Sequence, residues 1–326
     1  MGEKERLDLR HRRVKEIFQI PDAGEDLIDF FLNEEEQELI LRFGNEPFRR
    51  EELPEDTIAG EYHRGVLSKA NQEASLWKVN TFYGFLDVFC VSRKQEYDRL
   101  SLAQKRKLDD WYFDAYYDTL DTESGCPTQD RVYPLEEMLQ VVESDPRQIY
   151  LNYCDCRSLT GECGLPTRTC LTWKDGINTF VDRGLSVPLT KEEAKEVLRQ
   201  ADRAGLMHTT MGGSICNCCS DCCYLFRTQE RMKSYGSWPM TDWIIDLDES
   251  RCIGCGRCQK RCHLKVFTLT EEIQSPEGGQ EVRKQTLSEQ KLRRRRVSAD
   301  TARCAGCGIC VSTCPKEALH LKKRQA

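Results

Sequence analysis

Apolar residues recur with a helical period in the first third of the chain. Residues 34–43 carry apolar side chains at helical spacing, and Asn33-Glu-Glu-Glu36 is a capping box that marks the start of this predicted helix. We expect a short second helix at residues 51–53 and a third helix over residues 56–69. The next segment alternates as a β-strand does, and we expect one strand over residues 76–86.

This order of helix, short helix, helix and strand resembles a winged helix-turn-helix. The predicted third helix, which would be the recognition helix, carries His63 and Arg64 but also Asp56 and Glu61. DNA affinity depends on Lys and Arg side chains that neutralise phosphates, and this helix offers few. We therefore expect residues 1–120 to form a winged-helix-like, mostly helical domain that docks on protein, with DNA as the alternative partner.

Shorter periodic segments follow in the middle of the chain. Residues 102–117 predict a helix whose aromatic side chains pack in the core, and residues 135–143 predict another, which Asp145-Pro146 ends. Thr190-Lys-Glu-Glu193 is a second capping box, and Gly205 stands where a C′ glycine would end the helix that it opens. Such a helix returns the chain, so we expect the cysteines on its two sides to meet.

Two matching cysteine runs dominate the C-terminal part of the chain. Asp248-Glu-Ser-Arg251 before the first run matches Asp300-Thr-Ala-Arg303 before the second, an internal repeat with an offset of 52 residues. Both runs have the spacing C-x2-C-x2-C-x3-C, and Pro315 follows the second. The runs are Cys252, Cys255, Cys258 and Cys262, and then Cys304, Cys307, Cys310 and Cys314. Zinc sites usually pair their cysteines as separate C-x2-C motifs, whereas this spacing is typical of bacterial two-cluster ferredoxins.

The resemblance to two-cluster ferredoxins implies a pseudo-twofold ferredoxin fold for residues 241–326. In this family three cysteines of a run bind one [4Fe–4S] cluster, and the fourth binds the other cluster. The implied ligands are Cys252, Cys255, Cys258 and Cys314 for cluster one, and Cys304, Cys307, Cys310 and Cys262 for cluster two. The sequence departs from the family pattern at Cys262-His263, where Cys-Pro is usual, so we expect an altered hydrogen-bonding environment there.

Nine clustered cysteines lie upstream of these runs, in a predicted cysteine-rich module at residues 121–240, and Cys90 and Cys126 are isolated from them. The nine are Cys154, Cys156, Cys163, Cys170, Cys216, Cys218, Cys219, Cys222 and Cys223. Cysteine is reactive, and so dense a group is unlike a set of structural thiols. We interpret it as at least one more iron–sulfur cluster. A third cubane with spare cysteines, a third and a fourth cluster, and a non-cubane cluster all stay open, and a zinc site or a redox disulfide is the alternative.

Residues 150–226 resemble a cysteine-rich module of multicluster iron–sulfur proteins from anaerobic bacteria and archaea. The resemblance rests on Cys154-Asp-Cys156-Arg157 and on Cys216-Asn-Cys218-Cys219, which precede a two-cluster ferredoxin domain. It implies electron transfer alongside anaerobic oxidoreductases, and it names no substrate.

The composition and the apolar pattern of the chain bear on its cellular location and on the role of its cysteines. Nineteen cysteines could indicate a secreted disulfide framework, but such frameworks belong to short chains, and this one has 326 residues. No apolar segment of a signal peptide follows the charged residues 1–15, and no stretch approaches the roughly 18 apolar residues of a membrane span. We therefore expect a cytoplasmic protein whose thiols bind metal.

Charge is distributed unevenly along the chain. Residues 241–326 hold 17 Lys and Arg against 11 Asp and Glu, although the whole chain has a net charge of −6. This excess of positive charge partly offsets the negative charge of cysteine-bound clusters. A basic insertion at residues 270–297, with a turn at residues 276–279, is either a solvated hairpin or a docking surface for an acidic partner.

These patterns together predict a multidomain α+β protein with a winged-helix-like N-terminal domain, a cysteine-rich central module and a ferredoxin-like C-terminal domain. Glycine-rich nucleotide motifs, a Walker A sequence and His-Glu-x-x-His do not occur. We expect an electron-transfer protein or subunit that relays single electrons to or from an oxidoreductase partner and is not an enzyme by itself. The alternatives are a redox-responsive regulator that binds DNA, and an enzyme whose substrate binds at the upstream cluster.

Overall fold

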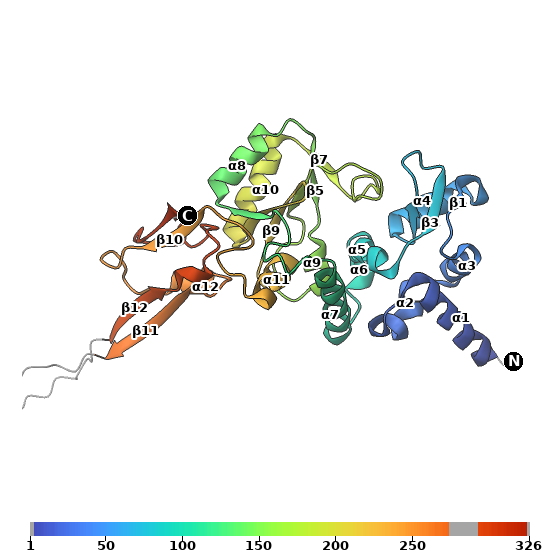
Figure 1. Ribbon diagram of the computed structural model, residues 1–326, viewed down its shortest axis with the longest axis horizontal. Coiled ribbons are helices and arrows are strands. Elements are labelled where there is room, and N and C mark those ends of the chain that lie inside the picture. Colours follow the sequence, from blue (N-terminus) through green and yellow to red (C-terminus); the bar gives the residue numbers. More distant parts are fainter. Residues whose placement is uncertain (1–2, 274–292, 325–326) are drawn as a thin grey trace, which may run out of the picture.

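Three regions follow one another along the long axis of the molecule (Figure 1). This computed structural model describes residues 3–273 and 293–324. The N-terminal helices lie at one end, the ferredoxin-like repeat lies at the other, and a six-stranded sheet stands between them (Figure 1). The architecture is therefore mixed α+β. None of the helices in these two ranges is both long and apolar enough to cross a membrane.

The N-terminal region packs helices and a small antiparallel sheet around an aromatic core. Phe18, Phe31, Phe82, Phe85 and Phe89 are buried and contact one another mostly edge to face. The strands pair in the order β1-β3-β2. The elements are α1 (Glu3–Phe18), η1 (Asp22–Leu27), α2 (Ile28–Phe31), α3 (Glu34–Phe43), β1 (Phe48–Arg49), η2 (Arg50–Glu52), α4 (Glu55–Arg64), β2 (Leu67–Lys69), β3 (Leu76–Val79), α5 (Phe82–Ser92), α6 (Lys94–Tyr97) and α7 (Leu102–Asp118).

Two boundaries predicted in this region are wrong. The helix expected over residues 56–69 is α4, which ends before Gly65, and residues 67–69 form β2. Gly65 has a φ of +99°, and a Cβ there would lie 2.8 Å from the Cβ of Val88. The close packing of α4 against α5 therefore sets the end of α4.

The strand expected over residues 76–86 stops at Val79, and α5 begins at Phe82. The side chain of Thr81 accepts a hydrogen bond from the amide of Gly84 (3.4 Å), which caps the new helix. A short apolar run cannot distinguish a buried strand from a buried helix by its period, so the cap was the better signal.

The central region is an antiparallel sheet in the order β4-β8-β9-β6-β5-β7. Helices α8 and α10 pack together on one face, where Leu171 and Ile215 are buried (Figure 1). Because side chains alternate along a strand, the neighbouring Cys170 and Cys216 lie on the opposite face. The elements are β4 (Arg131–Tyr133), α8 (Leu135–Ser144), β5 (Ile149–Asn152), α9 (Asp155–Thr160), β6 (Cys170–Thr172), β7 (Val187–Leu189), α10 (Lys191–Ala204), β8 (Met207–Met211), β9 (Ser214–Cys218) and α11 (Tyr224–Met232).

The C-terminal region consists of two small antiparallel sheets. The strand before the first cysteine run, β10, pairs with β13, which follows the second run. The strand after the first run, β11, pairs with β12, which precedes the second. This crossed pairing is the pseudo-twofold arrangement that the repeat predicts. The elements are β10 (Trp243–Leu247), α12 (Arg257–Arg261), β11 (Phe267–Ile273), β12 (Arg293–Ala299), η3 (Thr301–Arg303) and β13 (Leu319–Lys323).

The predicted basic insertion at residues 270–297 is described only at its two ends. Those ends belong to β11 and β12, which pair with each other. The predicted turn at residues 276–279 and the basic residue Lys291 lie outside the described residues.

A loop of the central region anchors the N-terminal region. The guanidinium of Arg183 is buried and donates to the carbonyl of Leu67 (3.1 Å) and to the hydroxyl of Ser68 (3.1 Å). It also donates to the carbonyl of Tyr62 and stacks on that ring, 4.3 Å from its centroid. Asp182 beside it pairs with the ammonium of Lys69. The end of α4 and the start of β2 therefore dock on the central region.

The ferredoxin-like region docks on the C-terminal end of α10. Arg261 donates to the carbonyls of Asp202 and Arg203, at 2.5 and 2.8 Å. His263 lies 2.7 Å from the carbonyl of Gly205 through its Nε2. These carbonyls lie at the C-terminal end of α10, where the helix dipole favours a cation such as Arg261, although the Asp202 carbonyl also accepts from the amide of Gly205.

Candidate metal centres

The eight cysteines of the two ferredoxin-like runs line two separate cavities. The lining of the first includes Cys252, Cys255, Cys258 and Cys314. The lining of the second includes Cys262, Cys304, Cys307 and Cys310. Each cavity thus receives three cysteines from one run and the last cysteine from the other run.

Glycines let each cysteine loop pass directly against a strand of the repeat. Gly254 and Gly306 have φ values of +64° and +65°, which side-chain-bearing residues rarely adopt. A Cβ at Gly254 would lie 2.3 Å from the carbonyl oxygen of Arg295, and one at Gly306 would lie 2.3 Å from that of Trp243. The two copies of the repeat therefore use the same contact, on β12 and β10 respectively.

The two cavities suit thiolates that bind a metal cluster. Their other walls are mainly apolar, including Leu247 and Val297 in the first and Ile245 and Phe267 in the second. Burial raises the pKa of Cys258 to about 11, and it raises the pKa values of Cys307 and Cys310 well above the usual range. A thiol that coordinates a metal is deprotonated outright. Iron would thus remove the penalty of charging these buried sulfurs, and the donor set fits a [4Fe–4S] cluster in each cavity.

The two cavities differ in their surroundings. Cys255 is exposed beside the first cavity, and the neighbouring Ile253 has 57% of its surface exposed. The second cavity is lined by Met207 of β8 and faces the central region. The first cavity therefore lies at the surface, and the second lies at the junction with the other cysteines.

Six of the nine upstream cysteines form one continuous group, called the six-cysteine group below. Their thiols hydrogen-bond one another in the order Cys156, Cys154, Cys170, Cys216, Cys218 and Cys223. The sulfurs of Cys218 and Cys223 are 3.1 Å apart. Strand alternation on β6 and β9 brings the middle members together. All nineteen cysteines of the chain lie in the described ranges, and all are free thiols.

Protons are shared unequally along the six-cysteine group. Hydrogen bonds from two neighbouring thiols hold the pKa values of Cys170 and Cys218 well below the usual range. Donating those bonds raises the pKa values of Cys216 and Cys223 well above it. Buried thiols in this arrangement cannot all ionise as bare groups, whereas a metal core would replace their protons with positive charge.

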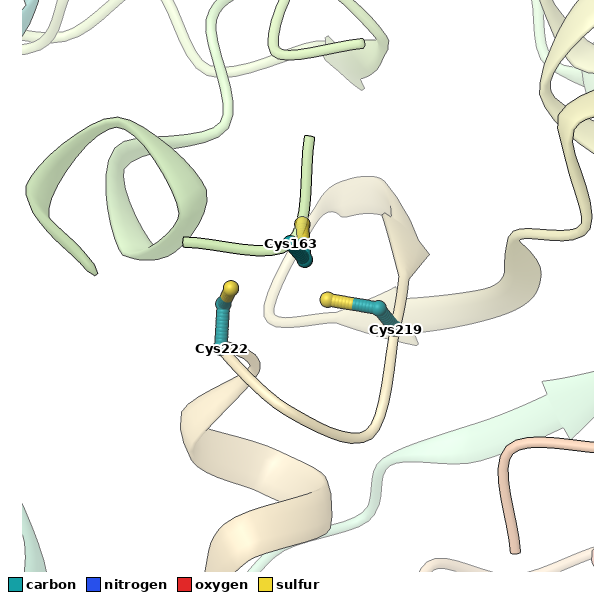
Figure 2. Close-up of side chains that lie close together, drawn as sticks. All are labelled: Cys163, Cys219 and Cys222. Carbon is teal, nitrogen blue, oxygen red and sulfur yellow. The ribbon is translucent and has the colours of Figure 1, made fainter. Parts of the chain in front are cut away.

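The remaining three upstream cysteines form a second group, called the three-cysteine group. The sulfurs of Cys163, Cys219 and Cys222 all lie within 4.8 Å of one another. Figure 2 shows their side chains converging from the loop after α9 and from the turn between β9 and α11. The nine cysteines that the sequence grouped as one set are therefore divided between two places.

Arg157 lies between the two groups. Its side chain is buried, and its guanidinium donates to the carbonyls of Pro166 (2.8 Å) and Asn217 (3.1 Å). It also donates to the sulfur of Cys219 (3.8 Å). Buried His208 contacts the side-chain oxygen of Asn217 through Nδ1 (2.6 Å), so it supports the strand that carries the cysteines.

A cavity of about 340 Å³ opens beside the six-cysteine group. Cys156, Cys170, Cys216 and Cys223 line one part of it, and each ferredoxin cavity measures only about 20 Å³ on the same scale. Aromatic and acidic side chains form much of the remaining wall. They include Tyr83, Tyr112, Tyr116, Tyr224, Asp87 and Asp155.

The sequence analysis did not identify these aromatic and acidic residues as part of a site. Tyr112 and Tyr116 were expected in the core, and Tyr112 does stack on Tyr83, with ring centroids 4.0 Å apart, but these tyrosines also reach the cavity. Burial, and then repulsion by Asp155, raises the pKa of Asp87 well above its usual range. Asp155 stands between two cysteines in the sequence, which was the one available signal.

The crossed lining of its two cavities by four cysteines each makes the C-terminal region a two-cluster, ferredoxin-like domain. A family of 4Fe-4S dicluster domains matches residues 251–318. Ferredoxin-3 of Rhodobacter capsulatus is 32% identical over 78 residues, which are 23% of this chain and 76% of that protein. A putative ferredoxin-3 of Sinorhizobium fredii is 35% identical over 83 residues, 25% of this chain and 79% of that protein. Ferredoxin-3 of a Nostoc species is 37% identical over 75 residues, 22% of this chain and 68% of that protein.

The chain therefore belongs to the ferredoxin family through its C-terminal region. It is an iron–sulfur protein with a dicluster domain for two [4Fe–4S] clusters, and such a domain implies electron transfer. The central region adds a possible further metal site. No solved structure matches the chain.

Proposed function

We propose that this protein relays single electrons to or from an oxidoreductase partner through two [4Fe–4S] clusters and at least one further iron–sulfur cluster. The observation that carries the proposal is the crossed lining of the two ferredoxin cavities. The proposed ligands are Cys252, Cys255, Cys258 and Cys314 for cluster one, and Cys304, Cys307, Cys310 and Cys262 for cluster two. A cluster bound in this way takes up and releases one electron with little rearrangement.

The six-cysteine group is the proposed site of the further cluster. It offers more thiolates than one cubane needs, and it adjoins the cavity of about 340 Å³. The surroundings of the sites suggest the order in which electrons would pass between them. Cluster one lies beside exposed Ile253 and Cys255, where a partner can approach. Cluster two lies beside Met207, next to the central region.

Metal analysis tests the number of clusters. Anaerobically purified protein is expected to contain about eight irons for the ferredoxin region and at least about four more for the six-cysteine group. Chemical iron and sulfide at or below eight per chain would remove the further cluster. In the variant Cys154→Ala, Cys156→Ala, we expect one distinct EPR signal to vanish while the ferredoxin signals stay. Cys126→Ala, at a thiol outside both groups, is the matched control.

For the chain as a whole we propose three domains, at residues 1–120, 121–240 and 241–326. We also propose that the central domain is a module of the kind found in multicluster proteins of anaerobes, and that its partner is an anaerobic oxidoreductase. Capture of a partner by the anaerobic holoprotein, identified by mass spectrometry, tests this. A partner with no redox cofactor would overturn the proposal.

We propose that the N-terminal domain is winged-helix-like and docks on protein. Two cations at the end of α4 and in β2 are already engaged: Arg64 pairs with Glu36, and Lys69 pairs with Asp182. DNA binding by this surface would have to release them. A gel shift with reduced and oxidised holoprotein tests the regulator alternative. No shift at low salt supports docking on protein, whereas a sequence-selective and salt-sensitive shift overturns it.

The large cavity favours a second candidate function, an enzyme that acts on a small molecule. At about 340 Å³ it is within the range of ligand sites, and it has far more room than either ferredoxin cavity. Such an enzyme needs one iron without a protein ligand. Cyanide serves as a small probe: a shift of the upstream cluster's EPR signal supports the enzyme, and an unchanged signal supports a pure relay.

A further inference from the structure

We infer that the three-cysteine group is a separate mononuclear metal site of the zinc class, distinct from the iron–sulfur centres. Its ligands are Cys163, Cys219 and Cys222. The inference goes beyond electron transfer, because zinc has no redox chemistry. It assigns to this part of the central region a structural or Lewis-acid centre.

The spacing of the sulfurs carries the inference. The three sulfurs all lie within 4.8 Å of one another. A tetrahedral zinc ion with Zn–S bonds of about 2.3 Å holds its sulfurs roughly 3.8 Å apart. In a cubane each thiolate binds a different iron at a different corner, so the sulfurs stand farther apart.

The ferredoxin cysteines of the same chain provide an internal comparison. All eight belong to the described residues, and no three of them form a group as close as the three-cysteine group. Sulfurs that surround a cubane are thus more widely spaced in this chain than Cys163, Cys219 and Cys222. This close three-way spacing distinguishes the three-cysteine group from the eight ferredoxin cysteines, whereas the six-cysteine group shows close spacing only between neighbours in its hydrogen-bonded series, such as Cys218 and Cys223 (3.1 Å).

The sequence around the group fits the same chemistry. Cys219 and Cys222 form a C-x2-C pair in the turn before α11, and Cys163 comes from the loop after α9 (Figure 2). A C-x2-C pair joined by a more distant cysteine is a common zinc arrangement. Cys219 and Cys222 are both 0% exposed and pack against Ala201 and Leu206, so the sulfurs are shielded from solvent on that side.

A buried cation lies beside the three-cysteine group. Three thiolates around a divalent ion carry one net negative charge. Arg157 is only 2% exposed, and its Nη1 lies 3.8 Å from the sulfur of Cys219. A buried arginine needs compensating negative charge, and a zinc trithiolate supplies part of it, beside Cys154 and Cys170 of the six-cysteine group.

The fourth coordination position is left to a small ligand. Within the described ranges, no fourth His, Cys, Asp or Glu joins the three sulfurs at this distance. Cys163 is only partly buried, so the group is reached from its side. Three protein ligands with one open position is the arrangement in which zinc binds water or an exogenous thiolate.

X-ray absorption at the zinc edge, together with metal analysis of the anaerobic holoprotein, tests the inference. We expect about one zinc per chain, with three sulfurs at about 2.3 Å. Zinc that is absent, or bound only through nitrogen and oxygen, overturns the inference. This measurement uses the unaltered chain, so it does not depend on the folding of any variant.

Variants add a second readout. Cys219→Ser and Cys222→Ser are each expected to lower zinc content at least tenfold and to leave iron unchanged, whereas Cys126→Ser leaves both unchanged. A loss of about four irons from either ligand variant would make the group part of a cluster and overturn the inference. The iron count of the unaltered protein tests the electron-transfer proposal separately, so the two failures are distinguishable.

Discussion

Gly306 has no room for a side chain, and this explains how one cysteine loop lies against β10. A Cβ there would meet the carbonyl oxygen of Trp243 at 2.3 Å and the hydroxyl of Thr241 at 2.6 Å. Its positive φ adds strain for any other residue. The carbonyl carbon and oxygen of Trp243 both lie in the way, and these backbone atoms cannot shift without a large cost in free energy.

Gly306→Ala is therefore expected to displace the loop that carries Cys304 and Cys307. Iron content should fall by up to about four per chain, and absorbance near 400 nm should fall with it. Gly176→Ala is the matched control, since a Cβ at Gly176 meets nothing within 4 Å. Full iron content in Gly306→Ala would contradict this account of the loop.

His263 stands where ferredoxins usually have proline, and the structure gives that departure a role. Its ring lies 2.7 Å from the carbonyl of Gly205, a contact that proline cannot make. The substitution ties the ferredoxin-like region to the end of α10. The sequence marked the position as unusual, but its partner is 58 residues away and could not be predicted.

His263→Ala is expected to cost about 1 kcal/mol of unfolding free energy, because a helix-end carbonyl loses its partner. Amide hydrogen exchange should quicken around residues 202–208, while iron content stays the same. His263→Gln, whose amide can still donate, should restore most of the protection. Unchanged exchange in the alanine variant would mean that this contact does not hold the junction.

Helices α3 and α10 begin where the sequence said they would, because each start is encoded within four residues. Asn33 and Glu36 form the first capping box, and Thr190 and Glu193 form the second. The end of α4 was missed because it depends on Val88 of α5. Local capping signals therefore predicted the helix starts, whereas the end of α4 depends on packing between helices, which the local sequence does not show.

Gly60 lies in the middle of α4 with open space around it. Gly60→Ala should therefore raise the unfolding free energy of the N-terminal region by about 0.5–1 kcal/mol, through helix propensity alone. Thermal or denaturant unfolding measures it. Gly84→Ala, in the first turn of α5, is the contrast: its Cβ would lie 2.8 Å from the side chain of Asn80, and no gain is expected.

The sequence predicted the ligands of the ferredoxin sites more completely than those of the upstream sites. The ferredoxin spacing indicated eight cysteines, and the structure places those eight around two cavities. The upstream cysteines could be recognised but not sorted. Cys218 and Cys219 are adjacent in sequence and yet join different groups, because the end of β9 directs successive side chains to different sides. Only the fold contains that information.

The three regions depend on a few buried contacts between them. Arg183 is the clearest case on the N-terminal side, since its guanidinium reaches Leu67, Ser68 and the ring of Tyr62. No local pattern marked this loop. The role of Arg183 follows from the position in which the central sheet holds its loop, next to β2.

Arg183→Ala should loosen the N-terminal region without disturbing the metal centres. Hydrogen bonds to a charged group contribute about 1.5–3 kcal/mol each, so a loss of at least 2 kcal/mol is expected. Faster amide exchange over residues 62–69, at constant iron content, is the readout. Exposed Arg203→Ala is the control and should change neither. Protection that survives in Arg183→Ala would place the anchor elsewhere.

Met207 connects the ferredoxin-like region with the cysteine-rich central sheet. It lines the second ferredoxin cavity, and its backbone pairs directly with Cys218 in the central sheet. In the proposed relay, Met207 would thus stand between the second ferredoxin cavity and the strand that carries Cys218.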